Sequence, residues 1–305
     1  MSVGNLRAYD VARRLYALIL PSQLVANCQK TPERKAWLEN LPALLEMLLV
    51  QWSVRLEPPF DHDGTCSWVS PVIRSDSTRA VLKLAMPHME GKHEIQGLRY
   101  WGGKPIVQLL EADDECGAML LERCLPGTSL RSQPEHEQDE IIAAIFKRVW
   151  ESTTQKAGLS AFRPLSQMID FWCEETIAQR YLWPDAGLVN EGLGVMKELA
   201  QPAPGDVLLV TDLHAGNILR AHRESWLAID PKPFLGDRAY DPVQHMMNCE
   251  TRLRRNPAQL VERIADLTAV DPDRLRLWTF ARAAADPRDD WHNIRWIEIA
   301  KALAP

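Results

Sequence analysis

Hydrophobic and polar positions along the chain follow two different periods. Residues 33 to about 52 repeat leucine at helical spacing and carry acidic side chains early, which predicts a helix packed on another part of the protein. Residues 60 to 86 form short segments rich in valine, isoleucine, serine and threonine, separated by "DHDGT" and "RSDSTR". This second pattern predicts a meander of antiparallel strands.

The rest of the chain is mainly helical in pattern. "MEGKHEIQGLRYW" (residues 89–101) has helical spacing, and "AMLLE" (residues 118–122) predicts a short strand followed by a Pro-Gly loop. From Pro134 onward helices dominate, except for strand and loop segments around residues 205–245. We therefore expect an α+β protein of two lobes, a small antiparallel sheet with a helix and a larger, mainly helical part.

The expected boundaries follow from this order of elements. Residues 1–52 form an N-terminal helical segment packed on the small lobe, residues 53–126 form the small lobe, and residues 127–305 form the helical lobe. Small-molecule sites usually lie in the cleft between two such lobes.

Charge and composition exclude several classes of protein. The net charge is −6 and no basic stripe is present, so we expect no nucleic-acid partner. The apolar stretch Leu15–Leu20 stops at Pro21, which is too short for a signal peptide and predicts a short amphipathic helix. No run approaches the roughly 18 to 20 apolar residues of a membrane helix. Six scattered cysteines without a C-x-x-C pair indicate reduced thiols, so we expect a cytoplasmic protein without a membrane partner.

The segment "LLVTDLHAGNIL" (residues 208–219) carries the clearest chemistry. Four residues separate Asp212 from Asn217, the spacing of the D-x-x-x-x-N kinase catalytic loop. In such a loop the carboxylate accepts a hydroxyl proton and the carboxamide oxygen holds Mg²⁺, while Gly216 would ease the turn. Asp230 follows a second apolar strand, and a hairpin would bring it beside Asn217 as another oxygen ligand.

The small lobe offers matching partners in the right chain order. Strict alternation in "RAVLKLAM" places Lys83 on the strand face opposite Leu82 and Leu84. Glu94 on the following helix is its expected counter-charge, with Glu90 as the alternative. Such a lysine–glutamate pair positions ATP phosphates in kinases. The competing interpretation is an edge lysine that points to water.

The loop "DHDGTCSWV" lies where a phosphate-covering loop would be expected. Gly64, Thr65 and Ser67 could offer backbone N–H groups or hydroxyls to phosphate, but an ordinary hairpin turn explains the same residues.

Taken in order, these residues resemble the aminoglycoside phosphotransferase family of the protein-kinase-like fold, in particular its streptomycin 6-kinase and hydroxyurea-resistance kinase branch. The resemblance spans most of the chain and rests on "WLENLPALLEMLLVQWSV", "TCSWV", "KHEIQGLRYW", "LLERCLPG", "DLHAGNIL", "AIDPKPFLGDRAYDP" and "LWTFARA". It implies that Asp212 is the catalytic base, that Asn217 and Asp230 bind Mg²⁺, and that Lys83 contacts ATP phosphates with Glu94 as partner.

The resemblance also implies an adenine site and a scaffold. Leu121 would border the adenine, and the backbone of Glu122 and Cys124 would hydrogen-bond it. Asp237 and Asp241 match the family's G-D-x-A-Y-D segment and are expected to support the catalytic loop. Lys232 would either neutralise phosphate charge or lie on the surface.

Two departures from the family pattern stand out. The family's loop usually begins H-G-D, whereas this chain has Val210 and Thr211 before Asp212, so another contact must brace the loop. The nucleotide loop also contains a single glycine. No A-P-E segment follows Asp230, which argues against a regulated protein kinase.

We expect in-line transfer of the γ-phosphoryl group of Mg·ATP to a hydroxyl of a small acceptor. A cationic aminocyclitol such as streptomycin would be drawn to acidic side chains of the helical lobe, although each of them is more simply explained as a solvated helix residue; the candidates are Asp170, Glu174, Glu175, Asp289 and Asp290. Hydroxyurea or another small metabolite is the alternative acceptor. The non-kinase alternatives are an inactive binding module and a metal-dependent hydrolase built on Asp212, His214 and Asp230.

Overall fold

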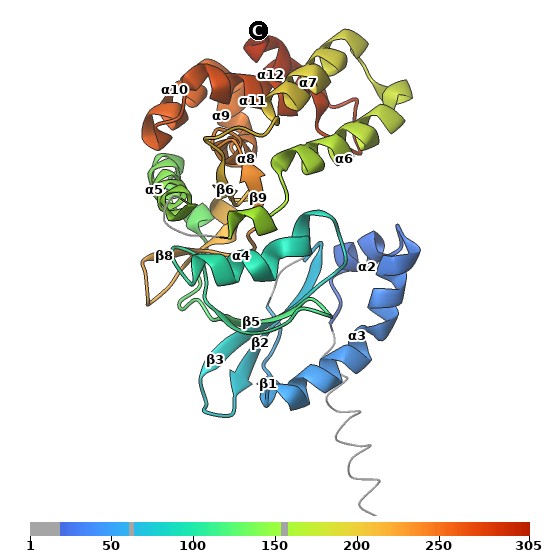
Figure 1. Cartoon of the computed structure of the whole chain (residues 1–305), viewed down its shortest axis with the longest axis vertical. Coiled ribbons are helices and arrows are strands. Elements are labelled where there is room, and N and C mark those ends of the chain that lie inside the picture. Colours follow the sequence, from blue (N-terminus) through green and yellow to red (C-terminus); the bar gives the residue numbers. More distant parts are fainter. Residues whose placement is uncertain (1–18, 61–63, 154–157) are drawn as a thin grey trace, which may run out of the picture. The chain divides into compact units, whose positions relative to one another are not determined.

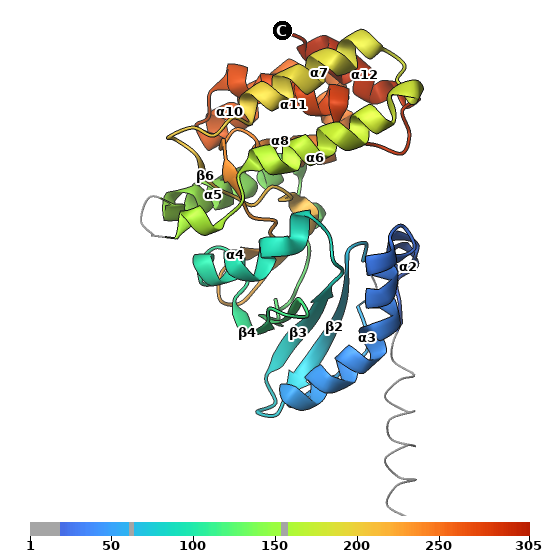
Figure 2. The same cartoon turned by 45° about the vertical axis from the view of Figure 1, so that its right-hand side comes forward.

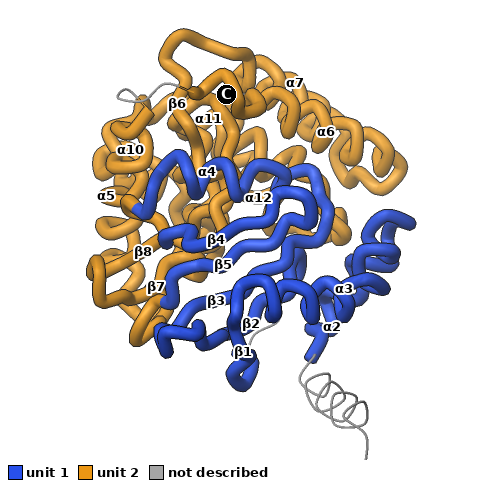
Figure 3. The backbone as a smooth tube through the Cα atoms, turned by 60° about the horizontal axis from the view of Figure 1, so that its bottom comes forward, with its two compact units in different colours: residues 1–103, 107–123 blue, residues 104–106, 124–305 orange. Residues whose placement is uncertain are grey.

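The computed structural model describes residues 19–60, 64–153 and 158–305. Most of the amphipathic helix expected around residues 13–20 lies outside the described residues. The chain divides into two compact units (Figure 3): one contains the described residues up to Gly103 together with residues 107–123, and the other contains residues 104–106 and those from Cys124 onward. Within the described residues, no helix is long and apolar enough to span a membrane.

The first unit is built on a five-stranded antiparallel sheet with the order β1-β2-β3-β5-β4. Its strands are β1 (Val54–Leu56), β2 (Ser67–Arg74), β3 (Arg79–Ala85), β4 (Leu109–Asp113) and β5 (Ala118–Glu122). The strands predicted within residues 60–86 and at 118–122 are therefore confirmed. Because β3 is the central strand, both of its neighbours, β2 and β5, pair with it along its length.

Helices cover both faces of this sheet (Figures 1 and 2). On one face lie α2 (Ser22–Cys28) and α3 (Pro32–Gln51), whose leucines pack against Leu82 and Leu84 in one buried core. The helix predicted at residues 33–52 is thus confirmed, and Pro32 at its first position suits a helix start. On the other face lies α4 (Glu94–Trp101), preceded by the short helix η1 (Glu90–His93).

The second unit is mainly helical. Its helices are α5 (Glu135–Thr153), α6 (Leu165–Ala178), α7 (Ala186–Leu199), α8 (Asp241–Asn248), α9 (Glu250–Arg255), α10 (Pro257–Thr268), α11 (Pro272–Ala285) and α12 (Ile294–Leu303). Short 3₁₀ turns are η2 (Leu130–Ser132), η3 (Leu159–Ala161), η4 (Arg180–Leu182) and η5 (Ala215–Asn217). The helical pattern expected after Pro134 is confirmed.

Two small antiparallel sheets interrupt the helices at the expected place. Strand β6 (Val207–Leu209) pairs with β9 (Phe234–Gly236), and β7 (Ile218–Arg220) pairs with β8 (Trp226–Ala228). The β7–β8 hairpin is the one predicted from the sequence, and the backbone N–H of Ile229 donates to the carbonyl of Asn217 at 2.9 Å. The hairpin therefore brings Ile229, the residue before Asp230, back to Asn217, the residue before β7.

Candidate active site

The lysine and glutamate predicted in the first unit lie in contact. The Nζ atom of Lys83 donates to Oε1 of Glu94 at 2.5 Å, and the two residues are only 5% and 3% exposed. A central strand holds the lysine on the face opposite the leucine core, so it is not the edge lysine of the competing interpretation. Burying a charged group is costly unless it pairs with an opposite charge, which explains why the two side chains lie in direct contact.

The other residues predicted to bind nucleotide are spread over this unit and the next. Gly64 and Thr65 lie in the loop before β2, and Ser67 is the first residue of that strand, while residues 61–63 of the same loop lie outside the described part. Leu121 is buried on β5, and Glu122 ends that strand with its backbone N–H donated to the carbonyl of Gln108 at 2.9 Å. Cys124 is the first residue of the second unit's main segment and is buried.

In the second unit, the carboxylate of Asp241 accepts hydrogen bonds from the loop that follows β6. The backbone N–H groups of Val210 and Thr211 donate to it at 3.2 and 2.8 Å, and the Trp150 indole N–H donates at 2.9 Å. Asp241 is fully buried, which raises its pKa to about 7, although these hydrogen bonds act in the opposite direction. Asp241 therefore has the supporting contacts expected of it.

Thr211 provides a second set of hydrogen bonds that holds this loop, which lacks the histidine and glycine usual in the family. Its φ of +43° lies in the left-handed region, which a β-branched residue seldom adopts. Its hydroxyl donates to the carbonyl of Lys232 at 2.8 Å, and its N–H is held by Asp241. The strained conformation is thus stabilised from both sides, and it turns the chain just before Asp212.

Two side chains hold the carboxylate of Asp212. The ammonium of Lys232 contacts Oδ2, and Nε2 of Gln244 on α8 donates to Oδ1 at 2.9 Å. Lys232 is 7% exposed, so it is not the surface lysine that the sequence allowed. Its ammonium also lies 3.5 Å from Oδ2 of Asp230, which links the two aspartates through one cation.

Asn217 is oriented so that its carboxamide oxygen faces away from the Asp212 backbone. Its Nδ2 donates to the backbone carbonyl of Asp212 at 3.0 Å, which assigns the amide nitrogen to that side. Asp230 has a φ of +54°, a conformation that aspartate tolerates better than most residues. Oxygen-rich side chains of this kind suit a hard divalent cation.

His214 fits a structural role better than metal binding. Its Nδ1 accepts from the Gly216 N–H at 3.0 Å and lies 3.4 Å from Nη2 of Arg131, so this nitrogen is unprotonated. Burial lowers the pKa of His214. Gly216 is needed for a reason other than an eased turn: a Cβ there would lie 2.7 Å from the His214 ring and 2.8 Å from Nε of Arg131.

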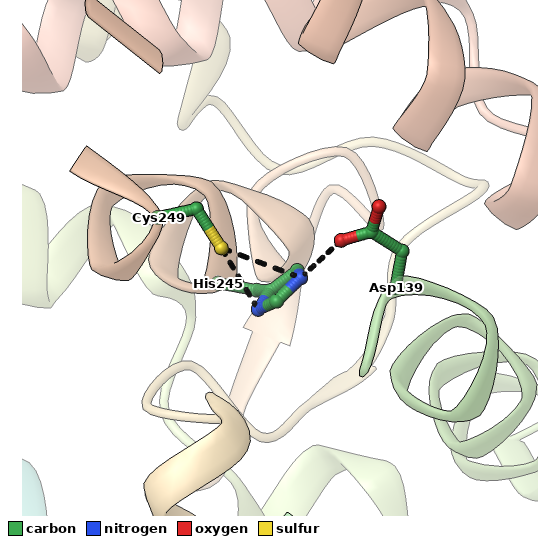
Figure 4. A group of neighbouring side chains, drawn as sticks. All are labelled: Asp139, His245 and Cys249. Carbon is green, nitrogen blue, oxygen red and sulfur yellow. Dashed lines mark hydrogen bonds and ion pairs between the residues drawn. The ribbon is translucent and has the colours of Figure 1, made fainter. Parts of the chain in front are cut away.

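A buried cluster anchors α8 to α5 (Figure 4). Asp139 accepts from Nε2 of His245 at 2.9 Å, and Cys249 lies 3.9 Å from the same ring. The three groups are close enough to suggest a metal site. However, Arg252 and Arg263 also donate to Asp139 at 2.8 Å, and two guanidinium charges would repel a cation. Burial raises the pKa of the Cys249 thiol to about 12, consistent with an inert packing residue.

The five acidic residues predicted to bind the acceptor are all exposed. Three lie on α6 and two in the segment after α11; they are Asp170, Glu174, Glu175, Asp289 and Asp290. Sequence reasoning missed Gln244, and also Arg282 and Asp286, which connect to it. A readable signal existed for Arg282, because a charged residue in the apolar run "FARAAAD" with an acid four positions later suggests a buried pair.

Residues 52–287 match the family model described as aminoglycoside/hydroxyurea antibiotic resistance kinase. The chain is 34% identical to the streptomycin 6-kinase of Streptomyces glaucescens over 274 residues, which cover 86% of this chain and 88% of that protein. It is 32% identical to the hydroxyurea phosphotransferase of Kitasatospora aureofaciens over 253 residues, 81% of this chain and 72% of that protein.

Solved structures show the likeness of fold. A choline kinase from Cryptosporidium parvum matches with a TM-score of 0.57 at 13% identity, covering 82% of this chain and 88% of that one. The choline kinase LicA from Streptococcus pneumoniae also matches with a TM-score of 0.57, at 14% identity, covering 85% and 98%. The α+β protein-kinase-like fold expected from the sequence is therefore confirmed.

Proposed function

We propose that this chain, which belongs to the aminoglycoside/hydroxyurea antibiotic resistance kinase family, transfers the γ-phosphoryl group of ATP to a hydroxyl of a streptomycin-like aminocyclitol. The observation that carries the proposal is the Asp212 carboxylate, presented by a braced loop beside Lys232, Asn217 and Asp230. An inactive binding module would not be expected to retain this set of groups.

In this mechanism the chain mainly positions groups and neutralises charge. Asp212 accepts the proton of the acceptor hydroxyl as the oxygen forms its bond to the γ-phosphorus. The bond from that phosphorus to the β,γ-bridging oxygen breaks, and ADP leaves with the bond's electron pair. Lys232, beside Asp212, is placed to neutralise the negative charge that gathers on the transferring group.

The residues present fit a divalent metal ion. Asn217 and Asp230 would hold Mg²⁺, because the carboxamide oxygen of Asn217 is turned away from the Asp212 backbone and Asp230 offers a half-exposed carboxylate. When bound, Mg²⁺ supplies charge neutralisation to the phosphate oxygens. In the first unit we assign Lys83 to the ATP phosphates, with Glu94 holding its ammonium in place. We assign the loop residues Gly64, Thr65 and Ser67 to the phosphate end of ATP as well.

One backbone hydrogen bond limits which atoms of Glu122 could contact the adenine. Since the N–H of Glu122 is donated to Gln108, an adenine contact from this residue must come from its carbonyl. Leu121 would border the ring and Cys124 would contribute its backbone.

The acceptor assignment rests on the relatives. The match to two streptomycin 6-kinases at 34% identity favours an aminocyclitol, and the exposed acids on α6 and after α11 offer a cationic acceptor its counter-charges. The hydroxyurea phosphotransferase at 32% identity makes hydroxyurea the second candidate, an acceptor that would need none of those acids.

The test is ADP release with Mg·ATP across streptomycin, other aminocyclitols, hydroxyurea and small amino alcohols. We expect release with streptomycin, abolished in Asp212→Asn and retained in Asp266→Asn, a matched change at an exposed position of α10. Release only with hydroxyurea would establish the second candidate. Absence of Mg·ATP binding would refute the kinase and favour the inactive module.

A further inference from the structure

We infer that Gln244, with the polarity of its carboxamide set by Arg282, is a positioning residue for Asp212. The inference rests on the proposed function, because it concerns the group that accepts the acceptor's proton. It arises from a chain of side-chain contacts that runs from Asp212 on the catalytic loop to Asp286 beyond α11.

The first step is the need for two contacts on Asp212. The terminal torsion of an aspartate is broad, so a single contact leaves the carboxylate free to rotate. Lys232 contacts Oδ2, and Gln244 donates to Oδ1 at 2.9 Å. Contacts on both oxygens define the plane of the group, and with it the direction in which a remaining lone pair meets the acceptor hydroxyl.

The second step concerns the direction of the amide. The oxygen and nitrogen ends of a glutamine differ only in donating or accepting, so a neighbour has to fix which end faces Asp212. Arg282 does this, since its Nη2 lies 2.9 Å from Oε1 of Gln244 and a guanidinium can only donate. The NH₂ group must then face Asp212 and donate to it.

The third step is the rigidity of Arg282. It is 5% exposed, and its Nε donates to Oδ2 of Asp286 at 2.9 Å. Its guanidinium carbon lies 5.3 Å from the ring of Trp172 and 5.2 Å from that of Tyr240. Burial alone would lower the pKa of Arg282, but the Asp286 carboxylate raises it, so the residue stays a donor.

Gln244 therefore holds the Asp212 carboxylate through a neutral amide that can only donate to it. Gln244 adds no charge and competes for no proton. Its hydrogen bond to Oδ1 balances the contact of Lys232 with Oδ2. Without it, the ion pair with Lys232 alone would orient the carboxylate. A displacement of about 1 Å at a reacting group can lower a rate on the order of 100-fold.

The decisive comparison is between two substitutions of Gln244. Gln244→Glu keeps the length and the acceptor for Arg282 but turns a negative oxygen toward Asp212; Gln244→Met keeps only the length. If Gln244 positions Asp212, both variants lose kcat on the order of 10- to 100-fold while KM for ATP is unchanged. Gln244→Met is the variant that decides, because it removes the donor to Asp212 and adds no charge; wild-type kcat in Gln244→Met overturns the inference.

A matched control separates positioning from loss of a buried amide. Gln138 is a buried glutamine of the same unit whose amide donates to backbone carbonyls, including that of Gln133 at 2.7 Å. Gln138→Met is expected to lower the melting temperature without the fall in kcat. An equal fall in kcat in this control would assign the effect to stability and overturn the inference.

A second measurement does not depend on turnover. In a double-mutant cycle of Gln244→Met and Asp212→Ala, the changes in unfolding free energy are expected to be non-additive, because the two side chains touch. Additive changes overturn the inference. Non-additive changes together with a wild type that phosphorylates no acceptor would support the contact and refute the proposed function alone.

Discussion

Adding one methyl group at Gly192 should separate α7 from α11 and disturb the site through Arg282. Gly192 is a buried position of α7. A Cβ built there lies 2.7 Å from Cβ of Ala284 and 3.1 Å from Cβ of Ala285, both on α11. Carbon atoms pack best at about 3.5 to 4.0 Å, so the helices would have to move apart by roughly 1 Å. Arg282 lies on the same helix.

The free-energy cost of this close approach can be isolated because α7 has another glycine two residues after Gly192. Gly194 is exposed, and nothing lies within 4 Å of a Cβ built on it. Each glycine-to-alanine change gains about 1 kcal/mol of helix propensity, and only Gly192→Ala adds the overpacking cost of about 1 to 3 kcal/mol. The difference between the two variants is therefore the packing term, about 1 to 3 kcal/mol in favour of Gly194→Ala.

The assay is urea unfolding of both variants, followed by thermal unfolding. Gly194→Ala should be more stable than wild type, and Gly192→Ala should melt below Gly194→Ala by about 2 to 12 °C, from about 2 to 4 °C per kcal/mol for a unit of this size. We also expect kcat to fall only in Gly192→Ala. Equal stability of the two variants would refute the close approach of α7 and α11 on which the reasoning depends.

Three further predictions concern the groups that hold the site. Glu94→Gln removes one partner of the buried Lys83 pair, which should cost about 3 to 5 kcal/mol of unfolding free energy and raise KM for ATP; unchanged ATP affinity would contradict the phosphate role. Thr211→Val deletes the hydroxyl bond to the Lys232 carbonyl and should cost about 1 kcal/mol with a lower kcat, as urea unfolding and ADP release can check. The third is a pH effect at Asp241, whose pKa rises from 3.8 in the unfolded chain to about 7 in the native protein. Native Asp241 holds its proton between these values, so its contribution to stability falls as the pH rises from about 4 to 7, by up to about 1.4 kcal/mol per unit. Wild type and Asp241→Asn with parallel stability profiles from pH 4 to 8 would contradict this.

Most of the fold could be predicted from local patterns. The helix at residues 32–51 follows from leucine spacing and an early acid, and the strand at 118–122 from a short apolar run. Both signals are local, because a helix or strand must present an apolar face at its own period. The β7–β8 hairpin was predictable for the same reason, and it placed Asp230 near Asn217.

The candidate site was predictable where chemistry demands a motif. The spacing of Asp212 and Asn217 is set by one short loop, so sequence carries it directly. The partner of Lys83 was also found, because a glutamate on an apolar helix stripe needs a counter-charge. The hydrogen bond from Thr211 to the Lys232 carbonyl could not be predicted in this way. The family's loop usually has glycine at that position, and glycine has no hydroxyl that could make such a bond.

By itself, the sequence determined which groups the protein has for phosphoryl transfer and the elements that carry them. Only the tertiary structure decided which way those groups point. Gln244 lies 32 residues from Asp212 in the chain, and Arg282 lies 38 residues beyond Gln244. No local pattern relates such positions, because their contact depends on how α8 and α11 pack around the catalytic loop. Helix period and loop spacing are properties of neighbouring residues, whereas the orientation of a carboxylate is a property of the packed core around it.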